Sequence, residues 1–188
     1  MQLHTFVDAS QDAYGACVYS RCCYMDGSVS VRLVAAKTRV SPLATMSIPR
    51  LELMGAVLGL NLTETIAETL EIKLTDVGFW CDSMNVLWWI RGRGRQFKPF
   101  VANRIGEIQR HTDPEQWQYV STNVNPADHL SRGMTAAKLI EETSWWKGPA
   151  FLYEPETCWP LKDIDKRDDD CIEMKRRDKF VITVSHAY

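Results

Sequence analysis

The chain has 188 residues, of which 45% are hydrophobic and 24% charged, as in an ordinary globular protein. A formal net charge of −2 excludes a molecule that binds nucleic acid through its overall charge, so any such binding must come from a local patch. No apolar run approaches the roughly 18 residues of a membrane span, and the N-terminus lacks a signal-peptide pattern, so we expect neither feature. The cysteines form no CxxC pair, which leaves a zinc site poorly supported.

The first forty residues predict three strands. Residues 2–8 and 14–24 have strand patterns, and Asp26 and Gly27 form a hairpin turn signal before a third strand over residues 29–40. Short connections between the three strands predict an antiparallel meander.

A long helix is predicted after the meander. Ser47 suits its N-cap and Pro49 its first turn, and apolar residues then recur at four-residue spacing from Met54 onwards. Residues 77–81 form a short apolar strand of the kind that is buried in a sheet, and Ser83 suits the cap of the next helix.

The remaining elements complete a mixed order. A further helix is expected over about residues 100–111, and residues 117–121 predict a final strand. A short helix should follow, with Pro126 in its first turn and Gly133 as its stop, before one more over 135–143. The order βββ-α-β-α-α-β-α predicts a mixed α/β sheet with helices on its faces.

The composition changes beyond the last predicted helix. Residues 145–161 hold three tryptophans and three prolines without periodicity, and we expect them to pack as an irregular strap over a domain spanning residues 1–144. Residues 162–188 begin with a stretch of seven basic and seven acidic side chains and almost nothing apolar. We expect that segment to be a charged linker or tail towards a following domain.

Four carboxylates each stand in an otherwise apolar or turn-forming segment. They are Asp8 in FVDAS, Glu52 in PRLEL, Asp82 in FWCDS and Asp128 in NPADH. Taken singly, each has an ordinary explanation as a strand end, a helix cap or an acid near a positive helix N-terminus. A buried carboxylate is costly unless it is paired, hydrogen-bonded or bound to a cation. Four that converge would form an oxygen-only cage suited to Mg²⁺ or Mn²⁺.

The four acids also carry a resemblance to a known family. Their order matches the D-E-D-D signature of the ribonuclease H fold. The words FVDAS, IPRLELMGAVLG, FWCDSMNVLWWI and VNPADHLSRG are similar, in this order, to the RNase H domain of BEL/Pao-type LTR retrotransposon Pol polyproteins. The similarity extends to about residue 161. It implies a ribonuclease H-like fold, with a five-stranded mixed sheet, its first three strands antiparallel, and helices on both faces.

The resemblance implies an enzyme, an endonuclease that hydrolyses the RNA strand of RNA/DNA hybrids during reverse transcription. Two Mg²⁺ ions, with Mn²⁺ as a possible substitute, would flank the scissile phosphate. By the same resemblance Asp8 would bridge both metals, Glu52 and Asp82 would share one, and Asp128 would hold the other.

The resemblance also implies the surroundings of the domain. Its partners would be an RNA/DNA hybrid and, in the same polyprotein, an upstream reverse transcriptase and a downstream integrase, in a cytoplasmic retroelement particle without a membrane. Retroviral members carry a histidine in a mobile loop before the last aspartate, but no histidine lies between His111 and Asp128 here. His129 follows that aspartate directly, where its side chain is expected to point elsewhere.

A basic stretch without acidic residues follows the second predicted helix. We predict that it contacts the phosphates of the hybrid, with Phe97 and Phe100 available for stacking or packing, and a solvated loop is the alternative. Its basic residues are Arg91, Arg93, Arg95, Lys98 and Arg104.

Two other function classes stay open at the level of the sequence. A catalytically silent RNase H-fold module would serve as a scaffold or bind nucleic acid, and it would show no metal-dependent cleavage. Half of an aspartic protease is suggested only by FVDAS, which lacks the glycine of the protease word. The βββα order does not suit a protease lobe.

Overall fold

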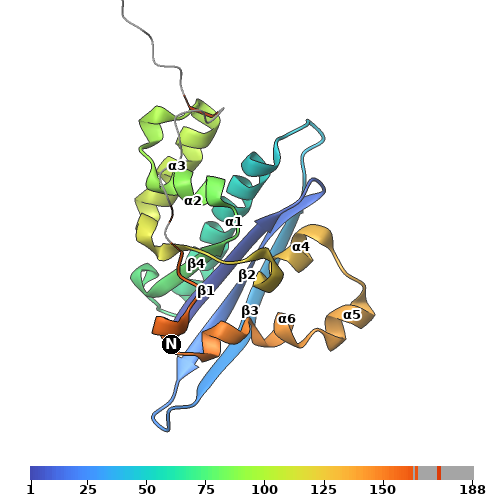
Figure 1. Ribbon diagram of the computed structural model, residues 1–188, viewed down its shortest axis with the longest axis vertical. Helices are drawn as coiled ribbons and strands as arrows, with labels where there is room; N and C mark the ends of the chain where they lie inside the picture. Colours follow the sequence, from blue (N-terminus) through green and yellow to red (C-terminus); the bar gives the residue numbers. More distant parts are fainter. Residues whose placement is uncertain (163, 165–172, 175–188) are drawn as a thin grey trace, which may run out of the picture.

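The computed structural model describes residues 1–162, 164, 173 and 174, which form a layered α/β domain (Figure 1). Its five strands make one sheet in the order β3-β2-β1-β4-β5. Strands β1 to β3 are antiparallel neighbours, whereas β4 runs parallel to β1 and β5 parallel to β4. The predicted mixed five-stranded sheet is therefore confirmed. The strands are β1 (Gln2–Ala9), β2 (Ala13–Cys23), β3 (Val29–Val40), β4 (Val77–Cys81) and β5 (Trp117–Tyr119).

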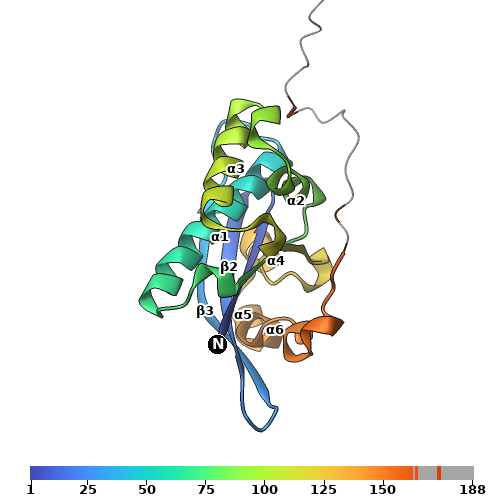
Figure 2. The ribbon, with the colours of Figure 1, turned by 90° about the vertical axis from the view of Figure 1, so that its left-hand side faces the viewer.

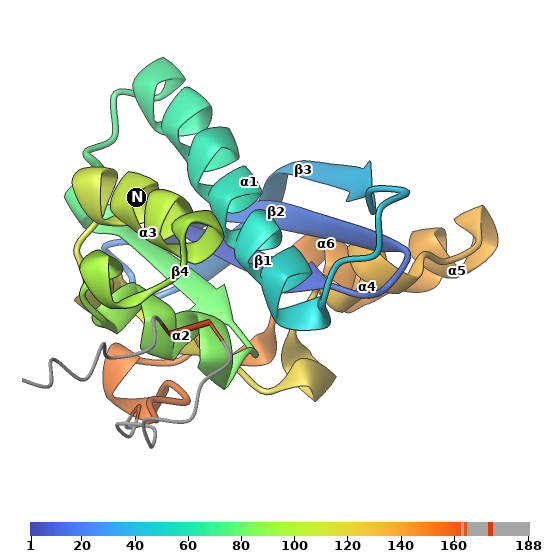
Figure 3. The same cartoon turned by 90° about the horizontal axis from the view of Figure 1, so that it is seen from above.

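Helices lie on both sides of this sheet (Figure 2). The first three helices lie on one side, and α1 crosses β1 and β2 (Figure 3). The last three lie on the other side. The helices are α1 (Ile48–Thr69), α2 (Met84–Arg91), α3 (Pro99–His111), α4 (Asp128–Arg132), α5 (Ala136–Glu141) and α6 (Thr143–Lys147). Short 3₁₀ turns are η1 (Leu74–Asp76), η2 (Gly94–Gln96), η3 (Pro114–Gln116), η4 (Thr122–Val124), η5 (Ala150–Tyr153) and η6 (Glu156–Cys158).

Alternation along the strands builds two cores from one sheet. Leu3 and Val7 of β1 point into the cluster under α1, α2 and α3, whereas Phe6 points into a second cluster on the other face. Successive strand side chains face opposite ways, so a sheet covered on both faces needs apolar residues at nearly every position. This explains why residues 77–81 are almost wholly apolar.

Residues 145–161 lie against the second face of the sheet. Trp145 and Leu152 are buried there, and their backbone carbonyls accept hydrogen bonds of 2.7 Å from the Tyr19 hydroxyl and from Arg21 Nε, respectively. The ring of Trp159 packs edge-on against that of Trp80. Most of the segment predicted as a charged tail, 162–188, lies outside the described residues. None of the helices that the structure describes is long and apolar enough to cross a lipid bilayer.

The structure corrects three predicted boundaries after residue 117. The last strand ends at Tyr119 rather than at residue 121, because Ser121 already caps the 3₁₀ turn η4. Pro126 precedes α4 instead of lying in its first turn, since Ala127 is the cap. The helix predicted over 135–143 is two short helices that meet at Glu142, whose carboxylate accepts a hydrogen bond from Ser144 N and so caps α6.

The close packing of α1 on the sheet yields a stability prediction. A Cβ placed on Gly59 would lie 2.5 Å from Cγ1 of Val7, a stiff β-branched side chain at the centre of the sheet. We expect Gly59→Ala to lower the free energy of unfolding by about 1–3 kcal/mol, in spite of the better helix propensity of alanine.

Gly106→Ala in α3 is the matched control in urea denaturation. A Cβ there meets nothing within 4 Å, so this variant should gain about 0.5–1 kcal/mol from helix propensity. A Gly59→Ala protein as stable as the wild type would contradict the close approach of α1 to β1.

Candidate active site

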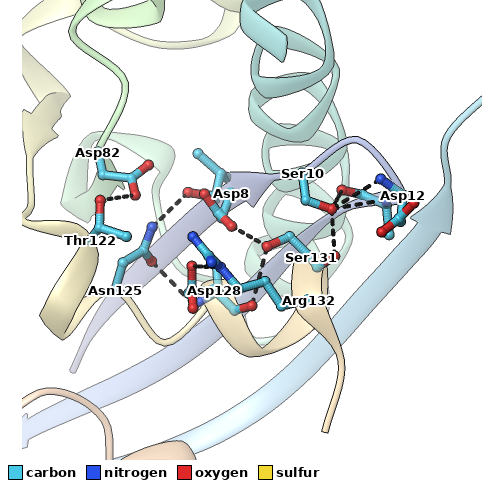
Figure 4. A network of polar contacts seen from close by, with 12 residues as sticks. Asp8, Ser10, Asp12, Asp82, Thr122, Asn125, Asp128, Ser131 and Arg132 are labelled. Atoms are coloured by element: carbon cyan, nitrogen blue, oxygen red, sulfur yellow. Dashed lines mark hydrogen bonds and ion pairs between the residues drawn. The ribbon is translucent and has the colours of Figure 1, made fainter. Parts of the chain in front are cut away.

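Two of the four predicted acids emerge side by side from parallel strands. Val7 of β1 pairs with Cys81 of β4, so that Asp8, the next residue of β1, lies beside Asp82, which directly follows β4. Both side chains therefore stand at the carboxyl edge of the sheet, where α/β proteins commonly bind ligands (Figure 4).

Asp8 is held at this edge by α4. The Ser131 hydroxyl donates a hydrogen bond to Asp8 Oδ2, and the Ser131 carbonyl accepts one of 2.7 Å from the Ser10 hydroxyl in the turn after β1. Asp128 opens the same helix, so these contacts bring it to Asp8 (Figure 4). The pKa of Asp8 is raised to about 7: burial is the largest cause, the hydrogen bond from Ser131 opposes it, and the negative charges of Asp82 and Asp128 add to the rise.

Glu52 reaches the site from near the start of α1. Its carboxylate accepts a hydrogen bond from the Ser83 hydroxyl, directly after Asp82. Burial raises the pKa of Glu52, the Ser83 hydrogen bond opposes this shift, and the charge of Asp82 adds to it. The same Ser83 oxygen caps α2 by accepting from Val86 N at 3.4 Å. Asp82 is therefore not needed as a helix cap, and it instead accepts a hydrogen bond of 2.7 Å from the Thr122 hydroxyl.

Asp128 lies beside a cleft of about 490 Å³ that Arg132 and Asn125 also line. Its Oδ1 accepts a hydrogen bond of 2.7 Å from Arg132 Nε one turn later in α4. This contact raises the pKa of Arg132, and the charges of Asp8 and Asp82 act in the same direction. Asn125 ties the approach to α4 to the sheet, because its Nδ2 donates to the Val7 carbonyl at 3.0 Å.

Each of the four carboxylates thus engages a donor of its own chain. Within the described ranges, no three histidine, cysteine or acidic side chains are gathered closely enough to hold a metal ion. The donor set nevertheless fits a hard divalent cation, since all of its ligands are carboxylate oxygens and mutual repulsion of their charges contributes to the raised pKa of Asp8. A cation would replace these hydrogen bonds. The four pairs are Asp8 with Ser131, Glu52 with Ser83, Asp82 with Thr122 and Asp128 with Arg132.

The sequence does not predict these hydroxyls as partners of the acids. Ser83 is predicted only as a helix cap, and no pattern marks Thr122 at the start of η4 or Ser131 near the end of α4. His129, next to Asp128, lines the cleft with its ring edge-on to Trp145 at a centroid distance of 6.2 Å.

The predicted basic stretch is divided in space. The side chain of Arg91 is engaged by contacts within the domain, because its Nη2 lies 3.4 Å from the Trp117 carbonyl oxygen and 3.6 Å from the Glu115 carboxylate. Phe97 is fully buried and belongs to the core rather than to a stacking surface. The guanidinium of Arg104 lies 3.6 Å from the centre of the Phe100 ring. Within the predicted basic stretch, the exposed residues are Arg93, Arg95 and Lys98.

Comparisons with known proteins find a similar family for the first part of the chain. Residues 1–83 match the family model described as Pao retrotransposon-like RNaseH-like domain, which covers Asp8, Glu52 and Asp82. No curated protein sequence matches the chain. The N-terminal RNase H domain of Rv2228c from Mycobacterium tuberculosis, solved as a fusion with maltose-binding protein, is 21% identical with a TM-score of 0.49, over 70% of this chain and 97% of that one. LC11-RNase H1, isolated from compost by a metagenomic approach, is 12% identical with a TM-score of 0.45, over 73% and 96%.

The matched region ends just after β4, and the structure continues from there. Strand β5 adds the fifth strand to the sheet, and α4 carries Asp128 close enough to Asp8 for its charge to raise the pKa of Asp8. The sheet order and the antiparallel start agree with the mixed sheet predicted from the sequence. Residues 1–83 of this chain are therefore similar to Pao retrotransposon-like RNaseH-like domains.

Proposed function

We propose that this domain is a metal-dependent endoribonuclease that hydrolyses the RNA strand of RNA/DNA hybrids. The observation that carries the proposal is the electrostatic coupling of four carboxylates from β1, α1, the end of β4 and α4. The charges of Asp82 and Asp128 raise the pKa of Asp8, and the charge of Asp82 raises that of Glu52. An ion pair with a purely structural role joins opposite charges, so it would not require four carboxylates whose negative charges repel one another. The match of residues 1–83 to a family model of Pao retrotransposon-like RNaseH-like domains supports the same reaction.

Asp8, Glu52, Asp82 and Asp128 would together hold the Mg²⁺ or Mn²⁺ ions. Two bound divalent ions would supply activation of water and neutralisation of charge on the scissile phosphate. The chain itself orients the carboxylates, because Ser83, Thr122 and Ser131 fix three of them from different elements. Arg132 neutralises the charge of Asp128 in the free chain. Once a cation binds Asp128, the guanidinium of Arg132 would be free to bind a phosphate.

The cleft beside Asp128 is the proposed place for the backbone of the RNA strand. Thr122 and Asn125 line it with a hydroxyl and an amide, which are groups that can bond to 2′-hydroxyls or phosphate oxygens.

We extend the proposal to the setting of the domain. It would act during reverse transcription in a cytoplasmic retroelement particle, as part of a polyprotein with a reverse transcriptase before it and an integrase after it.

The experiment that tests the proposal uses a hybrid whose RNA strand carries an end label. We expect internal cleavage of the RNA with Mg²⁺ and none with EDTA, and single-stranded RNA and duplex DNA of the same sequence should stay intact.

One observation favours the alternative of a silent hybrid-binding module, namely that each of the four acids accepts a hydrogen bond from a side chain of the protein itself. Binding of the hybrid without cleavage under all metal conditions would support that alternative.

The exposed basic residues yield a second prediction. The triple variant Arg93→Gln, Arg95→Gln, Lys98→Gln should weaken hybrid binding at low salt. Each lost phosphate contact should lower the slope of log K against log salt by about 0.9, or about two to three in total. Fluorescence anisotropy over a salt series measures both quantities.

Arg110→Gln at the exposed end of α3 is the matched control and should leave the slope unchanged. An unchanged slope in the triple variant would place the substrate track on another surface.

A further inference from the structure

Arg50, in the first turn of α1, is held by an acid from the far end of the described chain. Its Nε donates to Glu173 Oε1 at 2.9 Å and its Nη2 to Glu173 Oε2 at 3.0 Å. The backbone joins in, since Lys98 N donates to the Glu173 carbonyl at 2.8 Å and Met174 forms a β-bridge with Phe97. Residues 173 and 174 are the short red piece of ribbon beside the turn that leads into α3 (Figure 1).

The surroundings of this contact are basic and aromatic. The guanidinium of Arg50 lies 4.8 Å from the centre of the Phe100 ring, and that of Arg104 lies 3.6 Å from the same ring. Lys98 is exposed at the start of α3. Glu173, only 8% exposed, brings a negative charge into this group of cations.

A guanidinium that binds a carboxylate through two parallel hydrogen bonds presents the same fork to a phosphate. The Glu173 carboxylate thus occupies a position that a phosphate could take. Arg50 precedes Glu52 by two residues, which is about 3 Å along the helix axis. This fork therefore stands at the same end of α1 as the acidic site.

We propose that Arg50 is a phosphate-binding residue for the nucleic-acid substrate, and that Glu173 and Met174 occupy it as an autoinhibitory contact in the free chain. The inference rests on the proposed function, because its ligand is the phosphodiester backbone of the hybrid. It adds to that function a binding residue outside the predicted basic stretch and a competitor within the chain. A purely structural role for the contact makes a different prediction, namely lower stability on its loss with no gain in binding.

The test is a double-variant cycle in the full chain, with binding of a labelled RNA/DNA hybrid measured in EDTA over a salt series. Glu173→Gln should tighten binding about threefold to tenfold and steepen the salt slope by about 0.9, the value for one added phosphate contact. The same change in an Arg50→Gln background should give no gain, because the freed fork is then missing.

Two further variants separate displacement from overall charge. Glu68→Gln removes the same charge at the exposed far end of α1, and it should change affinity less than about twofold. Met174→Ala keeps the charge but loosens the docked segment, which packs on the core, and it should give a smaller gain in the same direction.

The inference is overturned if neither Glu173→Gln nor Met174→Ala tightens binding, or if the gain persists without Arg50. Cleavage of the hybrid by the wild type in Mg²⁺ is measured separately. A gain that depends on Arg50 in a protein without cleavage would support this inference and contradict the proposed nuclease. Cleavage without any such gain would do the reverse.

Discussion

Asp82→Asn is expected to lower Mg²⁺-dependent cleavage of an RNA/DNA hybrid by about three orders of magnitude or more. Removing one negative ligand from a divalent-metal site forfeits several kcal/mol of transition-state stabilisation, and each 1.36 kcal/mol is about tenfold in rate. The fold should be unaffected, because asparagine keeps an oxygen for Thr122 and Ser83 caps α2 independently. Initial rates on the labelled hybrid and thermal unfolding measure the two effects.

Asp76→Asn is the matched control for this variant. Asp76 is an exposed acid directly before β4, whereas Asp82 directly follows the same strand. The same substitution at the two ends of one strand should therefore leave activity intact in one case and remove it in the other. Full Mg²⁺-dependent activity in Asp82→Asn would end the assignment of the four acids.

Asp8→Asn is expected to stabilise the metal-free protein at pH 8. The folded-state pKa of Asp8 is about 7, against an ordinary value of 3.8, so the fold favours the neutral form. The stability that the neutral form contributes is complete below about pH 4 and is lost as the pH rises towards 7. With about 1.4 kcal/mol for each pKa unit, the neutral variant should be more stable at pH 8 by on the order of 2–4 kcal/mol.

Urea denaturation in EDTA at pH 4 and pH 8 measures this difference, which should vanish at the lower pH. Asp12→Asn, at an exposed position in the adjoining turn, should change the unfolding free energy by less than about 0.5 kcal/mol at either pH. Added Mg²⁺ should reduce the difference in unfolding free energy between Asp8→Asn and the wild type at pH 8, since a ligand that binds only the folded wild type stabilises it. Equal stabilities of the wild type and Asp8→Asn in EDTA at pH 8 would contradict this prediction, because the negative charge of Asp8 would then already be compensated in the folded protein.

The sequence predicts the sheet well because both of its faces are buried. The strand over residues 77–81 and the strand over residues 29–40 have the predicted bounds, since apolar runs and alternation are read directly from residue types. The boundaries after residue 117 fail because the 3₁₀ turns and very short helices there follow local backbone hydrogen bonds and, in α6, the side-chain cap of Glu142, rather than periodicity.

The acids could be chosen from the sequence, but their partners could not. A carboxylate in an apolar segment is conspicuous, whereas the hydroxyl that holds Asp8 comes from Ser131, 123 residues later. The basic residues show the converse limit. Contiguity suggested one patch, but the structure takes Arg91 into the fold and brings Arg50 to Phe100 and Arg104. Only the folded arrangement determines which of these charges face a common surface.

The central claim is that the four carboxylates jointly bind the cations that serve the reaction. Anomalous diffraction from a crystal of the chain with Mn²⁺ and a non-cleavable hybrid tests it most directly. We predict two manganese peaks among Asp8, Glu52, Asp82 and Asp128. A bound hybrid with no manganese peak among these four side chains would contradict the account.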